Sequence, residues 1–117
     1  MIKHVQCLRR HPDLTPAEFR HHWGEYQLLW RALAEQLRAV RVTFSTTLAV
    51  EANQQIVVLR GTEEPFDALV ETWLHDALEL GERFASPTAA EPRRAVFAKQ
   101  HQFLDLGRCS FFFAADD

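Results

Sequence analysis

The sequence predicts a small α+β domain with the element order β-α-β-β-α-β, and three observations lead to that prediction. Residues 15–37 carry the signals of a long amphipathic helix, short apolar or β-branched runs stand on both sides of it, and a second helical stretch precedes the last such run. Right-handed crossovers place the first and third strands, parallel to each other, at the centre of one antiparallel sheet with both helices on one face.

The first helix has a clear start. Thr15 is suited to accept a hydrogen bond at the N-cap, Pro16 suits the first helical position, and Glu18 completes a capping box. The apolar side chains that follow recur at helical spacing and form one face about five turns long, and we expect the helix to end between Leu37 and Val40. That face consists of Phe19, Trp23, Tyr26, Trp30, Leu33 and Leu37.

The first three strands are predicted from short runs. Ile2–Arg10 ends at a His-Pro-Asp turn, and Val40–Val50 is rich in Val, Thr and Ser. After a turn at Glu51–Gln55, the apolar run Ile56–Leu59 is interpreted as a further strand or an extension of the hairpin. Phe66–Leu74 is a strand with one apolar or small face (Ala68, Val70, Thr72, Leu74) and one mixed face (Asp67, Leu69, Glu71, Trp73).

The C-terminal third is predicted to contain the second helix and the last strand. Asp76 and Glu79 indicate a helix start, with Leu78 and Phe84 expected as core contacts. Ser86-Pro87 interrupts the pattern before a polar helical segment that runs to about Lys99, and residues 109–115 form the final strand. We expect the uncovered face of the sheet to be covered by a second copy of the chain, which makes a homodimer.

Composition narrows the class of protein. The 117 residues predict one domain over 1–117, with 47% hydrophobic and 25% charged residues. A net charge of −3 gives no reason to expect nucleic acid or an acidic membrane as partner. No apolar run is long enough to span a bilayer or to act as a signal peptide, and two cysteines make no disulfide framework. We expect a soluble cytoplasmic protein with reduced thiols.

Three sequence blocks follow one another along the chain. The first is Leu8-Arg9-Arg10-x-Pro12-x-Leu14-Thr15-Pro16-x-Glu18-Phe19-Arg20-x-x-Trp23, followed by Phe66-Asp67-x-x-x-Glu71-x-Trp73 and Phe103-Leu104-Asp105. These blocks resemble the EthD domain family, and the resemblance implies a ferredoxin-like, dimeric α+β barrel with a pocket between the sheet and the helices. Such folds serve polyketide cyclases, lactone isomerases, cofactor-free monooxygenases and small dehydratases. Where the family pattern has a histidine four residues after the tryptophan, this chain has Gln27, which cannot exchange a proton near pH 7.

The aromatic face of the first helix is the candidate substrate-binding surface. Trp23, Tyr26 and Trp30 can stack a planar ligand, and Gln27 or the Tyr26 hydroxyl can orient a carbonyl group. We add Trp73, from the third strand, to these substrate-binding residues. The alternative is that the rings only pack the helix onto the sheet, as apolar stripes usually do.

Two side chains are candidates for a catalytic proton carrier. His4 lies on a central strand and shares one face of it with Gln6, and its ordinary pKa suits proton transfer. Glu71, also on a central strand, becomes a general base if burial raises its pKa. Structural roles are the alternatives: a packed histidine, and a glutamate that is exposed or paired with an arginine. The other histidines show no metal-ligand spacing, so no metal is predicted.

Two hypotheses of different classes follow. The first is a cofactor-independent enzyme, of the lyase or isomerase type, that transfers a proton on an aromatic or polyketide-like carbonyl compound. Its partners are a small hydrophobic or aromatic ligand and a second copy of the chain. The second hypothesis is a non-catalytic small-molecule-binding or accessory protein. An ionisable side chain inside the same cavity as Gln27 would favour the enzyme.

Overall fold

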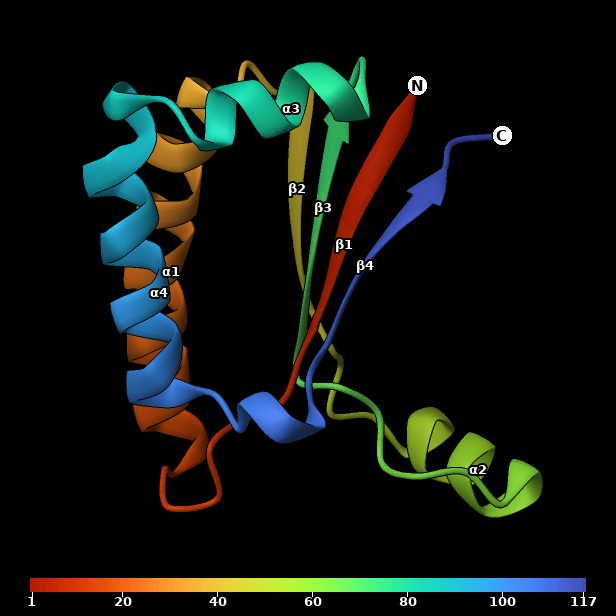
Figure 1. Cartoon of the computed structure of the whole chain (residues 1–117). Helices are drawn as coiled ribbons and strands as arrows, with labels where there is room; N and C mark the ends of the chain where they lie inside the picture. Colours follow the sequence, from red (N-terminus) through yellow and green to blue (C-terminus); the bar gives the residue numbers. More distant parts are fainter.

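The computed structural model describes all residues, 1–117, and its centre is a four-stranded antiparallel sheet. The strands are β1 (Ile2–Leu8), β2 (Arg41–Thr46), β3 (Ala68–Leu74) and β4 (Ser110–Ala115), in the spatial order β2-β3-β1-β4. Two long helices, α1 (Pro16–Gln36) and α4 (Ala90–Phe103), lie side by side on one face of the sheet (Figure 1). The fold is the ferredoxin-like α+β arrangement that the sequence predicted.

The expected parallel pairing of the first and third strands is wrong. β1 and β3 are central neighbours, but they run antiparallel, with His4 opposite Thr72 and Gln6 opposite Val70. The crossover through α1 makes β2 run in the same direction as β1 and leaves room for one strand between them. Because β3 enters that space after a reversal of the chain, it pairs antiparallel with both β1 and β2.

Helix α1 forms as its sequence predicted. Thr15 Oγ1 accepts a hydrogen bond from Glu18 N (3.1 Å), and Glu18 Oε1 accepts one from Thr15 N (2.9 Å), which completes the capping box. The helix ends at Gln36, and the next residue, Leu37, still packs in the core. All six members of the apolar stripe are buried, so the stripe is the surface by which α1 contacts the sheet and α4.

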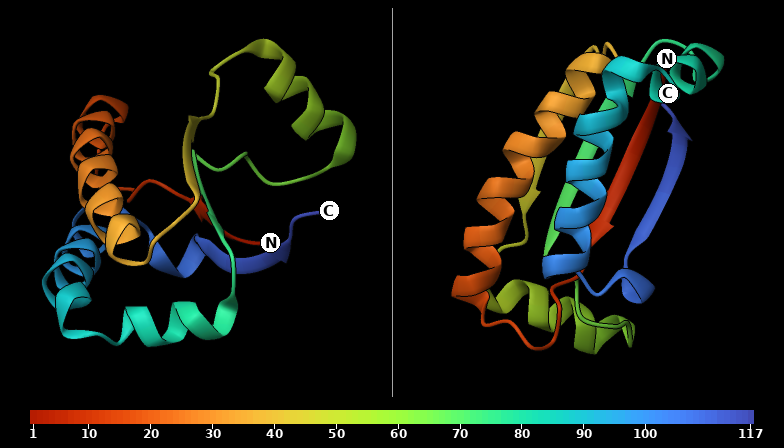
Figure 2. Two further views of the ribbon diagram at one scale, coloured as in Figure 1. Left: turned by 90° about the horizontal axis from the view of Figure 1, so that it is seen from above. Right: turned by 60° about the vertical axis from the view of Figure 1, so that its left-hand side comes forward.

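The segment after β2 differs from its prediction. Glu51–Gln55 is not a turn and Ile56–Leu59 is not a strand, because both belong to helix α2 (Glu51–Arg60). Glu51 to Gln55 are compatible with a helix, and Gly61, at φ 64°, ends it in the left-handed conformation. The helix has no buried residue and lies on the opposite side of the sheet from α1 and α4 (Figure 2).

The second helical region is broken in two. Helix α3 (Ala77–Phe84) begins at Asp76, whose side chain accepts a hydrogen bond from Leu78 N (2.7 Å). A short 3₁₀ turn, Pro87–Ala89, then leads into α4. Phe84 packs against the core as predicted, but Leu78 does not, because its position on α3 leaves it 76% exposed. No helix in the structure has the length and apolarity that crossing a membrane requires.

The cap of α1 gives the first prediction. Thr15→Ala removes the side-chain acceptor for the Glu18 N–H and should lower the free energy of unfolding by about 1 kcal/mol. Urea unfolding followed by circular dichroism measures the change. The matched control is Thr62→Ala, an exposed loop position, which should change the free energy by less than about 0.5 kcal/mol. An equal loss in both variants would contradict the capping role.

Candidate functional site

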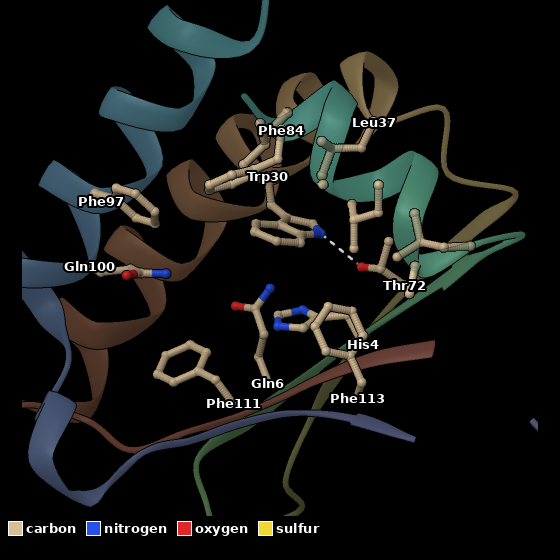
Figure 3. Close-up of a pocket in the computed structure, with 15 residues that line it drawn as sticks. His4, Gln6, Trp30, Leu37, Thr72, Phe84, Phe97, Gln100, Phe111 and Phe113 are labelled. Atoms are coloured by element: carbon tan, nitrogen blue, oxygen red, sulfur yellow. Dashed lines mark hydrogen bonds between the residues drawn. The ribbon is translucent and has the colours of Figure 1, made fainter. Parts of the chain in front are cut away.

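A cavity of about 590 Å³ lies between the helical layer and the sheet (Figure 3). Strands β1, β3 and β4 form its floor, α1 and α4 form its walls, and α3 closes one end. Ten of its fifteen lining residues are hydrophobic, so most of the surface that they present binds water weakly. The lining consists of His4, Gln6, Trp30, Leu33, Leu37, Thr72, Leu74, Ala77, Leu80, Gly81, Phe84, Phe97, Gln100, Phe111 and Phe113.

His4 is the only ionisable side chain in this lining. Its ring is stacked on Trp30 (centroids 5.8 Å apart, planes at 19°) and tilted against Phe113 (5.0 Å). Nδ1 of His4 is buried and has no hydrogen-bond partner. Desolvation by burial lowers the pKa of His4 below its ordinary value of 6.5, so the imidazole is neutral at pH 7.

Gln6 contributes the second buried polar group. Its side chain is fully buried, and its Oε1 accepts a hydrogen bond from the Tyr26 hydroxyl (2.6 Å). The Tyr26 oxygen in turn accepts one from Gln100 Nε2 (3.0 Å). Nε2 of Gln6 has no partner. The sequence indicated that Gln6 shares a strand face with His4 but assigned it no role, and Gln100 was not singled out at all.

A third polar contact fixes one wall of the cavity. The indole Nε1 of Trp30 donates to Thr72 Oγ1 on β3 (2.9 Å), as Figure 3 shows. Because both partners are buried, this bond satisfies two groups that burial would otherwise penalise. It holds the indole plane beside the His4 ring.

Three predicted binding residues on α1 lie outside the lining. Trp23 is buried and its Nε1 donates to Thr46 Oγ1 (3.2 Å), so it packs α1 onto β2. Tyr26 is fully buried behind Gln6, and it reaches the cavity only through that side chain. Gln27 is partly exposed and is not among the residues of the cavity wall. Of the four α1 candidates, only Trp30 lines the cavity.

Glu71 and Trp73 lie on the opposite face of the sheet. On β3 they alternate with Val70, Thr72 and Leu74, which face the helices. The Glu71 carboxylate pairs with Lys3 Nζ at 3.1 Å, and the same ammonium lies 5.6 Å from the Trp73 ring centroid. The structure therefore does not bring these two side chains together with His4. Nor does any group of three or more His, Cys, Asp and Glu side chains have a metal-holding arrangement.

This geometry defines the chain as a ferredoxin-like α+β domain with a mostly apolar, aromatic-walled cavity between its two layers, partly open to solvent. The EthD domain family model matches residues 11–107, and the chain belongs to that family. No curated protein matches the sequence.

Solved structures share the fold at low sequence identity. An EthD (ethyl tert-butyl ether d) family protein from Bacillus halodurans is 13% identical, with a TM-score of 0.65 and coverage of 100% of this chain and 99% of that chain. A hydroxynitrile lyase from Passiflora edulis is 13% identical, with a TM-score of 0.65 and coverage of 99% and 93%. A dimeric ferredoxin-like protein of unknown function from Thermobifida fusca is 16% identical, with a TM-score of 0.65 and coverage of 98% and 90%.

The buried His4 makes stability depend on pH. The unfolded chain binds a proton at His4 near pH 6.5, whereas the folded chain binds it only at lower pH. The neutral His4 therefore contributes fully to the free energy of unfolding above pH 6.5. This contribution is lost as the pH falls towards the lowered pKa. Below pH 6.5, the free energy of unfolding should fall less steeply in His4→Phe than in the wild-type protein. Urea unfolding at several pH values measures it.

The control for this effect is the exposed His75. His75→Phe should leave the acid side of the stability profile as it is in the wild-type protein. If the free energy of unfolding of His4→Phe depends on pH in the same way as that of the wild-type protein, His4 does not cause the loss of stability at acid pH.

Proposed function

We propose that this protein is a cofactor-independent enzyme that transfers a proton on an aromatic or polyketide-like carbonyl compound, in a cyclisation, dehydration or isomerisation. The observation that carries the proposal is His4, a neutral imidazole in a mostly apolar, aromatic-walled cavity. Because burial lowers the pKa of His4, its imidazole is deprotonated at neutral pH, which is the form that accepts a proton.

The proposed reaction needs only the His4 imidazole and the substrate. The His4 imidazole takes a proton from the carbon next to the substrate carbonyl, and the C–H electron pair moves into the carbonyl to give an enolate. The imidazolium then returns the proton to another carbon or to a leaving oxygen. Because the cavity is mostly apolar, the attraction between imidazolium and enolate is stronger than in water.

The other cavity residues would bind and orient the substrate. Phe111 and Phe113 offer aromatic surface to a planar ligand, Trp30 forms part of the wall, and α3 separates the ligand from solvent at one end. Such positioning is worth several kcal/mol when it holds the reacting atoms close together. The hydroxynitrile lyase among the similar folds supports a lyase-type activity at this scaffold.

A second candidate function is binding without catalysis. The small number of polar groups in the cavity favours it, because an apolar lining retains a hydrophobic ligand whether or not a proton moves. The two functions differ in one property: only the enzyme exchanges a carbon-bound proton of its ligand through His4.

Proton exchange with solvent tests the enzyme. The probe is 2-acetylnaphthalene in D₂O, and the loss of its methyl C–H signal is followed by NMR. The wild-type protein should exchange the methyl protons faster than buffer, with a rate that rises with pH through a midpoint below 6.5 as His4 loses its proton. His4→Gln should reduce the protein-dependent rate by about a hundredfold or more.

His75→Gln is the matched control, since His75 is exposed and outside the cavity. It should exchange at the wild-type rate. Binding of the ketone with no exchange by the wild-type protein would favour the binding function, and full exchange by His4→Gln would exclude His4 as the base.

We also propose that the protein is a homodimer formed through the uncovered face of the sheet. That face carries apolar side chains, including Leu69, Trp73 and the 46% exposed Phe112, with no helix over them. Helix α2 lies on the same side (Figure 2). Its Val58 and Leu59 are more than three-quarters exposed. A second copy would cover both surfaces at once, and the similar protein from Thermobifida fusca is described as dimeric.

Sedimentation at micromolar concentration tests the dimer. The wild-type protein should sediment with twice the mass of one chain, and Phe112→Glu should shift it towards the monomer by placing a charge in the interface. Leu28→Glu is the control, because Leu28 is equally apolar, 70% exposed and located on α1. A monomeric wild-type protein at this concentration would contradict the proposal.

A further inference from the structure

The amide nitrogen of Gln6 is a buried donor without a hydrogen-bond partner. The Gln6 side chain is 0% exposed, and Gln6 is one of the residues that line the cavity. An N–H that is buried without an acceptor costs free energy, and proteins retain few such groups. A group of this kind at a cavity surface indicates an acceptor that arrives with the ligand.

The hydrogen bonds around Tyr26 fix the direction of this amide. Gln100 Nε2 donates to the Tyr26 oxygen, so the Tyr26 hydroxyl hydrogen is free to donate to Gln6 Oε1. With its oxygen engaged by Tyr26, Gln6 presents its NH₂ group to the cavity. Burial raises the pKa of Tyr26 far above its ordinary value, which keeps the hydroxyl protonated and therefore a donor.

We propose that Gln6 is the residue that binds the carbonyl oxygen of the substrate, and that Tyr26 is the positioning residue that holds the amide in this orientation. The inference rests on the proposed function and narrows it, because the ligand must offer an acceptor oxygen at Gln6. The substrate class is then a planar aromatic compound with a ketone or another enolisable carbonyl group.

The placement of Gln6 relative to His4 fits this chemistry. The two residues are separated by one position on β1 and face the same side, so their Cα atoms lie about 7 Å apart. Figure 3 shows the Gln6 amide beside the His4 ring. A carbonyl oxygen at about 3 Å from the amide nitrogen leaves the neighbouring carbon near the imidazole. As the enolate forms, negative charge grows on the oxygen that Gln6 contacts, and the hydrogen bond strengthens.

A matched pair of ligands tests the role of Gln6. 2-Acetylnaphthalene and 2-isopropenylnaphthalene have nearly the same shape, but only the ketone has an acceptor oxygen. The wild-type protein should bind the ketone more tightly, as measured by isothermal titration or fluorescence. Gln6→Met should reduce the ratio of the two affinities about tenfold and leave hydrocarbon binding within about twofold.

Two further variants separate the roles of the residues. Tyr26→Phe should lower the ketone preference by a smaller factor, about threefold, because the freed amide can turn its oxygen to the cavity. Gln27 lies on α1, as Tyr26 does, but outside the cavity, so Gln27→Met should keep the wild-type preference for the ketone over the hydrocarbon. An unchanged preference in Gln6→Met, or a wild-type protein that does not favour the ketone, would overturn the inference.

The infrared band of the bound carbonyl supplies a test that needs no variant to fold. In the wild-type protein the C=O stretch of 2-acetylnaphthalene should lie at lower frequency than in hexane, because a hydrogen bond weakens the C=O bond. A band at the hexane position would overturn the inference. Ketone preference without proton exchange would overturn only the catalytic function, and exchange that does not depend on Gln6 would overturn only the role of Gln6.

Discussion

The contact between the aromatic stripe of α1 and the sheet is the constraint on which the other features depend. Each of its three polar ring tips reaches a different strand: Trp23 bonds Thr46 on β2, Tyr26 bonds Gln6 on β1, and Trp30 bonds Thr72 on β3. The rings are stacked along the helix at 6.2 to 6.5 Å between centroids. Their apolar bodies bury large areas, and their donors fix the register of the helix on the sheet.

This register explains why the cavity lies where it does. Towards the N-terminal end of α1, Phe19 and Trp23 fill the space between the layers with Phe103 and Phe44. Beyond Trp30, helices α1 and α4 do not fill that space, and α3 closes it from one end (Figure 1). The floor then consists of β1, β3 and β4 side chains, so His4 and Gln6 face a volume whose lining is mostly apolar. In such surroundings each polar group has a large electrostatic effect.

The sequence predicted most of the architecture because its signals are local. The capping box and the stripe of α1 depend on residues three or four positions apart, and the two faces of β3 follow from period-two alternation. Ile56–Leu59 misled the prediction because β-branched residues favour strands, whereas in α2 the preceding residues and Gly61 decide for a helix. The antiparallel relation of β1 and β3 was also missed, since it depends on which gap in the sheet β3 fills.

By itself the sequence determined the family, the order of the main elements and the presence of His4 on a central strand. Only the tertiary structure decided which polar groups share the cavity. The sequence offered His4 and Glu71 as proton carriers and Gln27 as a group that orients a carbonyl. In the structure Gln27 lies outside the cavity wall, and Glu71 pairs with Lys3 on the opposite face. Gln6 acquires its orientation from Tyr26 and Gln100, which are 20 and 74 residues away from their partners in the sequence. Such contacts depend on how helices pack on the sheet, and no local spacing encodes that packing.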